Sequence, residues 1–169
     1  LIGGTVLWHA GAEGREPPLP PDRAAGNSLR PGHTPDSHVL AQEFHLCEAF
    51  ALATWDPWLP LTVFGQTAAN TAASSDRTAW LVGISAGTAR AVGGVELGWS
   101  YRELQADATL AALADSDFGG TSLHAHRLHI RWQPIRNIWL TCSWRTVHPL
   151  GKNGRSDFDL WQADLLVRF

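Results

Sequence analysis

Apolar and polar residues alternate with a period of two along several segments, and the alternation is clearest at the C-terminus. From residue 161 onward, one row of positions is apolar: Trp161, Ala163, Leu165, Val167 and Phe169. The intervening row is mostly polar: Gln162, Asp164, Leu166 and Arg168. Because successive side chains of a β-strand point to opposite faces, this pattern predicts a strand with one apolar and one polar face.

Similar alternation, regular in some places and looser in others, predicts seven further strands. They span residues 1–9, 44–53, 60–67, 80–86, 95–102, 127–132 and 138–145. The chain is therefore expected to be all-β, with about eight antiparallel strands that follow one another up and down.

The connections between these strands alternate in length. Long connections are predicted at 147–157, 104–121, 68–77 and 10–43, and short ones at 133–136, 88–92 and 54–59. An outer-membrane barrel has short turns on its periplasmic side and long loops outside, whereas a soluble β-sandwich has no reason to sort its loops. The Pro- and Gly-rich stretch 10–43 is expected to be an extracellular loop or a loop folded into the lumen, with a linker between two units as the alternative.

Composition agrees with a membrane protein that crosses with strands. Charged residues make up 17% of the chain, against roughly 25% in an average soluble domain. No apolar run of about 18 residues occurs, so a transmembrane helix is excluded by length. Strands cross a bilayer only as closed barrels, because every backbone polar group in the hydrocarbon needs a protein partner. We therefore predict an antiparallel up-and-down transmembrane β-barrel over residues 1–169.

The aromatic residues fit the two borders of a bilayer. The chain has nine Trp and one Tyr, and amphipathic indoles favour the level of the lipid headgroups. The residues predicted at the membrane interface are Trp8, Trp132, Trp161 and Phe169, with Trp55 and Trp58 also near predicted strand ends. The alternative is that these rings pack the core of a soluble protein.

The polar rows carry charges that would line a lumen. These residues are Glu96, Arg102, Arg127, Arg131, Arg145, Asp164 and Arg168. Charges that face water set the ion preference of a pore, so the excess of Arg predicts a weak preference for anions. The alternative is that these side chains pair with one another across the wall.

Other candidate chemistry is weaker. His124 and His126 share one strand face but His129 falls on the other, which argues against a metal site. No nucleophile motif of the G-x-S-x-G type occurs, and Ser143 has no base partner that the sequence identifies. We predict no catalytic residue, no metal and no cofactor.

Two acidic residues and two cysteines are further candidates for metal binding or a disulfide. Asp115 and Asp117 lack the remaining ligands of a calcium loop, so a turn role is favoured. Cys47 and Cys142 match no metal or redox motif, and whether they pair is left open. A net charge of −3 without a basic cluster argues against nucleic acid as a partner.

Several short motifs resemble one bacterial family. They are the run Pro60–Gly65 leading to Asn70, the run Tyr101–Ala108, the loop Asp115–Thr121 followed by His126–Leu128, and the terminal Phe169. Over roughly residues 44–169 these motifs are similar to the "putative porin" family. The resemblance implies a Gram-negative outer membrane, a barrel with more strands than this chain supplies, and passive diffusion of small solutes. It also implies that strand 161–169 is read by the barrel-assembly machinery.

The combined prediction is the C-terminal part of a porin-type channel, with outer-membrane lipid and small solutes as partners. The chain has no Met and no leader pattern at Leu1, so we expect residue 1 to be a processing or truncation point. The alternatives are a small eight-stranded structural or adhesion barrel and a lipocalin-like binder of apolar ligands. A homo-oligomer is left open.

Overall fold

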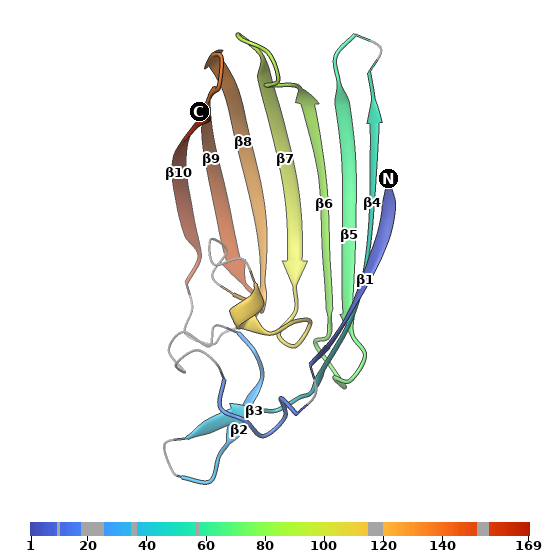
Figure 1. The fold of residues 1–169 in the computed structure, drawn as a ribbon. Coiled ribbons are helices and arrows are strands. Elements are labelled where there is room, and N and C mark those ends of the chain that lie inside the picture. Colours follow the sequence, from blue (N-terminus) through green and yellow to red (C-terminus); the bar gives the residue numbers. More distant parts are fainter. Residues whose placement is uncertain (10, 18–25, 35–36, 57, 115–119, 152–155) are drawn as a thin grey trace.

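A computed structural model describes residues 1–169 except 10, 18–25, 35–36, 57, 115–119 and 152–155. Its main feature is a curved antiparallel sheet of eight strands (Figure 1). The strands of this sheet are β1 (Ile2–His9), β4 (Phe44–Trp55), β5 (Leu61–Asn70), β6 (Thr78–Gly87), β7 (Val95–Leu104), β8 (Leu123–Ile135), β9 (Ile138–Pro149) and β10 (Phe158–Val167). The other described elements are a hairpin of β2 (Leu29–Pro31) and β3 (His38–Leu40) and the 3₁₀ helix η1 (Ala111–Leu113).

Each long strand pairs with its neighbours along the chain, in the order β1-β4-β5-β6-β7-β8-β9-β10. The prediction of eight antiparallel up-and-down strands is therefore confirmed. The outermost strands, β1 and β10, have one paired edge each and do not pair with each other in the described part of the chain. The sheet curves around a hollow but stays open (Figure 1).

The longest connections gather at one end of the sheet, as the sequence predicted. The links β4–β5, β6–β7 and β8–β9 lie at one end, toward which both chain termini also point (Figure 1). The long links 10–43 and 105–122 lie at the other end, together with β2, β3 and η1, but the β5–β6 link at that end (71–77) is no longer than the β6–β7 link (88–94). We refer to the first as the short-turn end and to the second as the long-loop end.

Two details differ from the sequence prediction. Strand β8 continues to Ile135, into the expected 133–136 turn, and the reversal falls at residues 136–137, where Asn137 has a φ of 65°. The extension arises because Gln133 accepts a hydrogen bond from Gly93 (2.8 Å) and donates one to Gly94 (3.0 Å), which ties it to the β6–β7 turn. The stretch 10–43, expected to be without regular structure, contains the β2–β3 hairpin.

The two faces of the sheet have opposite character. The outer, convex face carries apolar side chains that are exposed, such as Leu128 (45%), Ile130 (44%) and Leu165 (65%). The inner, concave face carries the charged rows, and its buried apolar residues gather toward the long-loop end in two small clusters. One cluster is formed by Ala12, Leu40, Phe44 and Leu110, the other by Leu123, Ala125 and Val147. Most large apolar side chains of the wall thus face outward.

Among the described residues, no helix combines the length and the hydropathy needed to cross a bilayer.

Candidate functional site

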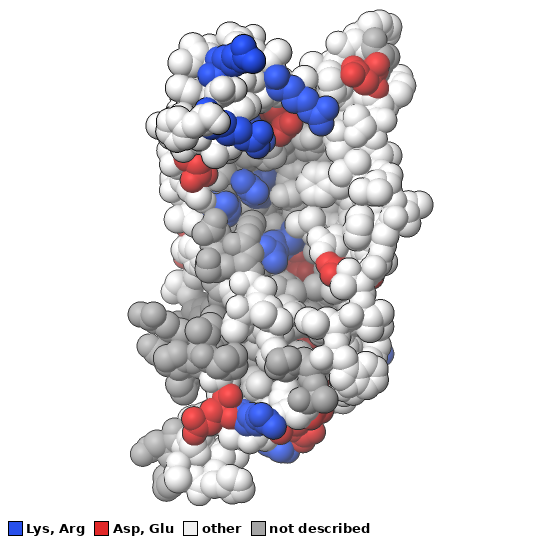
Figure 2. Space-filling model, viewed as in Figure 1, with Lys and Arg blue, Asp and Glu red and all other residues white. Residues whose placement is uncertain are grey.

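The inner face of the sheet gathers all the charged residues predicted to line a lumen. Strand register places Glu96 and Arg102 on β7, Arg127 and Arg131 on β8, Arg145 on β9 and Asp164 on β10, with Arg168 just after it. Figure 2 shows basic side chains in the hollow, mainly over the half formed by β7–β10. The structure therefore brings this predicted set together on one surface.

Three arginines form a row across neighbouring strands. Arg127 and Arg145 lie directly opposite each other in the β8–β9 ladder, and Arg102 is the diagonal neighbour of Arg127 in the β7–β8 ladder. Arg145 is only 3% exposed and donates a hydrogen bond to Oε1 of Gln162 at 2.6 Å. Like charges opposite each other destabilise a sheet, so this row concentrates positive potential at some cost to folding.

A second cationic group lies nearer the short-turn end. The guanidinium carbons of Arg131 and Arg168 lie 5.9 and 5.1 Å from the centre of the Trp139 ring. Trp139 is anchored because its indole N–H donates to the carbonyl of Ala89 at 2.7 Å. This explains an aromatic residue in an otherwise polar row: the ring is a platform for two cations, within the usual cation–π range.

Glu96 lies beside this cationic group. It is the cross-strand partner of Arg131 and has an oxygen 3.5 Å from Nε2 of His129. The ring of His129 in turn lies over Gly98, where a Cβ would come within 2.1 Å of its Cε1. Glycine at position 98 is therefore what lets this imidazole lie flat against the inner face.

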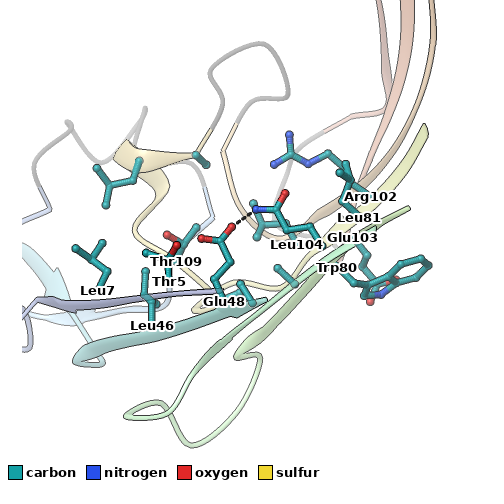
Figure 3. A pocket seen from close by; sticks show the side chains of 16 residues that line it. Thr5, Leu7, Leu46, Glu48, Trp80, Leu81, Arg102, Glu103, Leu104 and Thr109 are labelled. Atoms are coloured by element: carbon teal, nitrogen blue, oxygen red, sulfur yellow. Dashed lines mark hydrogen bonds between the residues drawn. The ribbon is translucent and has the colours of Figure 1, made fainter. Parts of the chain in front are cut away.

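A cavity of about 440 Å³ opens on the inner face near the long-loop end. Its walls come from β1, β4, β5, β6 and β7, and residues 108–114 form its roof (Figure 3). Glu48 on β4 and Arg102 on β7 both line it, and the Gln66 amide donates a hydrogen bond to the Glu48 carboxylate. Glu48, which the sequence analysis did not single out, is thus an inward-facing acid of the candidate site.

The roof of this cavity is held in place by two asparagines. Asn27 donates to the carbonyls of Ala106 (2.7 Å) and Thr109 (2.8 Å) and accepts from the Ala111 amide (2.7 Å). Asn70, fully buried, donates to the carbonyl of Asp107 at 2.9 Å.

Asp107 and Glu43 complete these contacts. The Asp107 carboxylate accepts from the Ser28 amide at 2.9 Å, and Asn70 also donates to the Glu43 carbonyl at 2.8 Å. We call Asn27, Glu43, Asn70 and Asp107 the loop clamp, because they join residues 26–43, the end of β5 and residues 105–111. Asparagine and aspartate commonly bond local backbone groups, but nothing in their spacing indicated that these partners would be so distant in sequence.

Glu43 is the titratable member of the clamp with a shifted pKa. Its carboxylate accepts hydrogen bonds from the amides of Ala12 (2.9 Å) and Gly11 (3.1 Å). The bond from Ala12 is the largest cause that holds the pKa of Glu43 below its ordinary value of 4.5. Hydrogen bonds to the charged form favour that form, so the clamp is built around an ionised Glu43.

The predicted interface aromatics are all exposed, but they do not share two levels of the sheet. Trp8 stacks on His45 at 3.9 Å toward the long-loop end. Trp161 stacks on Trp144 at 5.7 Å near the middle of the outer face, in the same register row as Leu128. Trp132 and Phe169 lie toward the short-turn end. The outer face around and between these rings carries Leu128, Ile130, Leu140 and other apolar side chains.

The histidines divide between the faces as parity predicted. His124 and His126 lie in the outer row, where His124 stacks on His148 at 5.1 Å and His126 contacts the Tyr101 ring at 4.8 Å in a tilted arrangement. His129 lies in the inner row. No group of three His, Cys, Asp or Glu side chains within the described residues could hold a metal ion.

Ser143 has a neighbour that the sequence did not reveal. His129 is its cross-strand partner and contacts Glu96 on the far side. The Ser143 hydroxyl is buried, however, and has no hydrogen-bond partner among the described residues, because the His129 ring lies over Gly98 instead. The three side chains lie in a row without forming the bonded nucleophile and base that acyl transfer requires.

The two cysteines and the two acidic loop residues are the remaining candidates from the sequence. Cys47 on β4 and Cys142 on β9 are both exposed, unpaired and on the outer face. Asp115 and Asp117 lie outside the described residues.

Comparison with known proteins identifies a family for this chain. A comparison with curated proteins and another with solved structures each found no match. The sequence model of the family described as "Putative porin" matches residues 38–169, which is more than half of the chain and includes seven of the eight strands of the curved sheet. With an antiparallel sheet that is charged inside and apolar outside, the chain belongs to the putative porin family.

Proposed function

We propose that this chain forms part of the wall of a bacterial outer-membrane β-barrel that lets small solutes diffuse passively. The observation that carries the proposal is the contrast between the faces of the sheet. Leu128, Ile130 and Leu165 stand exposed on the convex side, while the arginines lie on the concave side. A soluble protein would turn these faces the other way.

Free energy favours lipid on the outer face. Burying one large apolar side chain contributes about 1.5–3 kcal/mol, and soluble monomers rarely expose apolar patches larger than a few hundred Å². The exposed outer row repeats from β1 to β10. Hydrocarbon around the barrel would cover it without any further protein.

The open edges favour a barrel larger than this sheet. In a bilayer the free backbone groups of β1 and β10 need partners, and an eight-stranded barrel is filled by its own side chains whereas open pores need about 16–18 strands. Additional strands paired to β1 and β10 would satisfy both requirements. An eight-stranded adhesion or lipocalin-like barrel instead needs β1 to pair with β10, which they do not in the described residues.

Orientation follows from the two ends of the sheet. The short turns and the C-terminus would face the periplasm, and the long loops with the loop clamp would face outside. Strand β10 with Phe169 would present the signal for the barrel-assembly machinery. Trp132 and Phe169 at one level and Trp8 at the other would lie among lipid headgroups, whereas Trp161 lies in the register row of Leu128.

The charges of the inner face give the proposed pore a weak preference for anions. Its predicted lining holds five arginines and two acids, and Glu48 adds one more acid. The test is conductance of the purified protein in a planar bilayer under a KCl gradient. We expect ion-conducting steps with a reversal potential displaced toward chloride. A preference for potassium would refute the selectivity, and the absence of conductance would refute the channel.

A further inference from the structure

The cavity at the long-loop end has apolar walls, and one acidic side chain (Glu48) and one basic side chain (Arg102) also line it. We propose that it is a binding subsite for a small zwitterion with an apolar side chain, such as an aliphatic amino acid. Access of solute to this face rests on the proposed channel function, but binding itself can be measured without it.

Size and lining match such a ligand. The volume of about 440 Å³ lies within the range of about 300–1,000 Å³ that is usual for small-molecule sites. Its apolar lining is formed by leucines and alanines on both the sheet and the roof, the leucines being Leu7, Leu46, Leu81, Leu104 and Leu113. This surface would hold an aliphatic side chain away from water.

The two charges come from separate walls. Glu48 and Arg102 stand on β4 and β7, three strand spacings apart and offset by two residues in register, or about 16 Å between backbones along the sheet. Both side chains extend over the concave face and line the same cavity (Figure 3). The remaining space suits a molecule that carries its own cation and anion a few ångströms apart.

Each charge is suited to one end of the ligand. Glu48 is half-buried and is oriented by the hydrogen bond from Gln66, so its carboxylate would receive an ammonium group. The guanidinium of Arg102 has five N–H donors and can receive a carboxylate while it keeps the contacts it already makes.

The other charged and aromatic residues that line the cavity do not point into it, and Arg127, the diagonal neighbour of Arg102, lies outside the lining. Glu103 and Trp80 also border the cavity, but both belong to the outer row, and the Trp80 ring points away from it (Figure 3). Glu48 and Arg102 are therefore the inward-facing charges of the described lining. A site with one charge of each sign favours a zwitterion over a simple cation or anion.

The test is ligand-observed saturation-transfer NMR on the detergent-refolded protein with leucine, isoamylamine and 4-methylvalerate. The two analogues lack the carboxylate and the ammonium group, respectively. Because each charged hydrogen bond contributes about tenfold or more to affinity, we expect leucine to bind at least about tenfold more tightly than either. Equal binding of all three compounds would overturn the proposal.

Variants assign the two charges. Glu48→Gln should weaken leucine and isoamylamine by about tenfold or more and leave 4-methylvalerate unchanged, with Glu48→Asp restoring part of the loss. Arg102→Gln should weaken leucine and 4-methylvalerate but not isoamylamine. Arg168→Gln, on the same face but outside the cavity, is the matched control. If Glu48→Gln weakens all three compounds equally while β-sheet circular dichroism is intact, the charge assignment is wrong.

The two experiments distinguish failure of the proposed channel from failure of the proposed subsite. KCl conductance without selective leucine binding would leave the proposed function standing and remove the subsite. Selective leucine binding in detergent without KCl conductance would leave the subsite standing and refute the channel.

Discussion

Replacing Asn70 by Ala should detach the roof of the cavity from the sheet. The Asn70 side chain is completely buried. Its amide nitrogen donates to the carbonyls of Glu43 (2.8 Å) and Asp107 (2.9 Å). Its oxygen accepts from the amides of His45 (3.0 Å) and Ala72 (3.1 Å). One side chain thus connects three segments that are far apart in sequence.

The magnitude follows from these four bonds. Each contributes about 1 kcal/mol net, and a buried backbone group left without a partner costs about 1–3 kcal/mol. Water that enters the shortened site would recover part of the loss. We therefore expect Asn70→Ala to lower the free energy of unfolding by about 3–4 kcal/mol. Asn70→Asp should also destabilise, because a carboxylate keeps the acceptor and loses both donors.

The assay is urea unfolding of the protein reconstituted in lipid, followed by tryptophan fluorescence. Thr71→Ala is the matched control, since the Thr71 hydroxyl makes one hydrogen bond, to the His45 carbonyl at 3.1 Å, in an exposed position. That variant should lose less than about 1 kcal/mol. If Asn70→Ala were no more destabilised than Thr71→Ala, the loop clamp would not hold the roof.

Three further predictions test the faces and the clamp. Leu128→Lys on the outer face should destabilise the lipid-embedded protein by about 2–4 kcal/mol in urea unfolding. Thr141→Lys on the inner face, between Arg131 and Asp164, would meet one like and one opposite charge and should be destabilised less; equal effects would mean that Leu128 does not face lipid. Arg127→Gln should move the reversal potential under a KCl gradient toward potassium, and an unchanged potential would show that this arginine does not face the permeation path. Because the pKa of Glu43 is lowered by folding, its contribution to stability is present above its ordinary value of 4.5 and is lost as pH falls through the lower folded value. Urea midpoints measured from pH 7 downward should therefore fall less steeply for Glu43→Gln than for the unmodified protein, and parallel curves would contradict this.

Some differences between prediction and structure have a common cause. The turn after β8 lies beyond the predicted position because Gln133 pairs with the β6–β7 turn, a partner far away in the chain. The row of Glu96, His129 and Ser143 was missed because cross-strand neighbours depend on register. Alternation along one strand does not determine which residue of the next strand lies opposite.

The sequence by itself determined the strands, their two faces and the position of the longest connections. These are local properties, because side chains alternate along any strand and the length of a connection follows from the number of residues between two strands. Only the tertiary structure decided that Asn27 and Asn70 hold residues 105–111 over the sheet, and that Glu48 and Arg102 line one cavity. The physical reason is that both features depend on contacts between segments many residues apart, which form only once register and curvature bring the strands side by side.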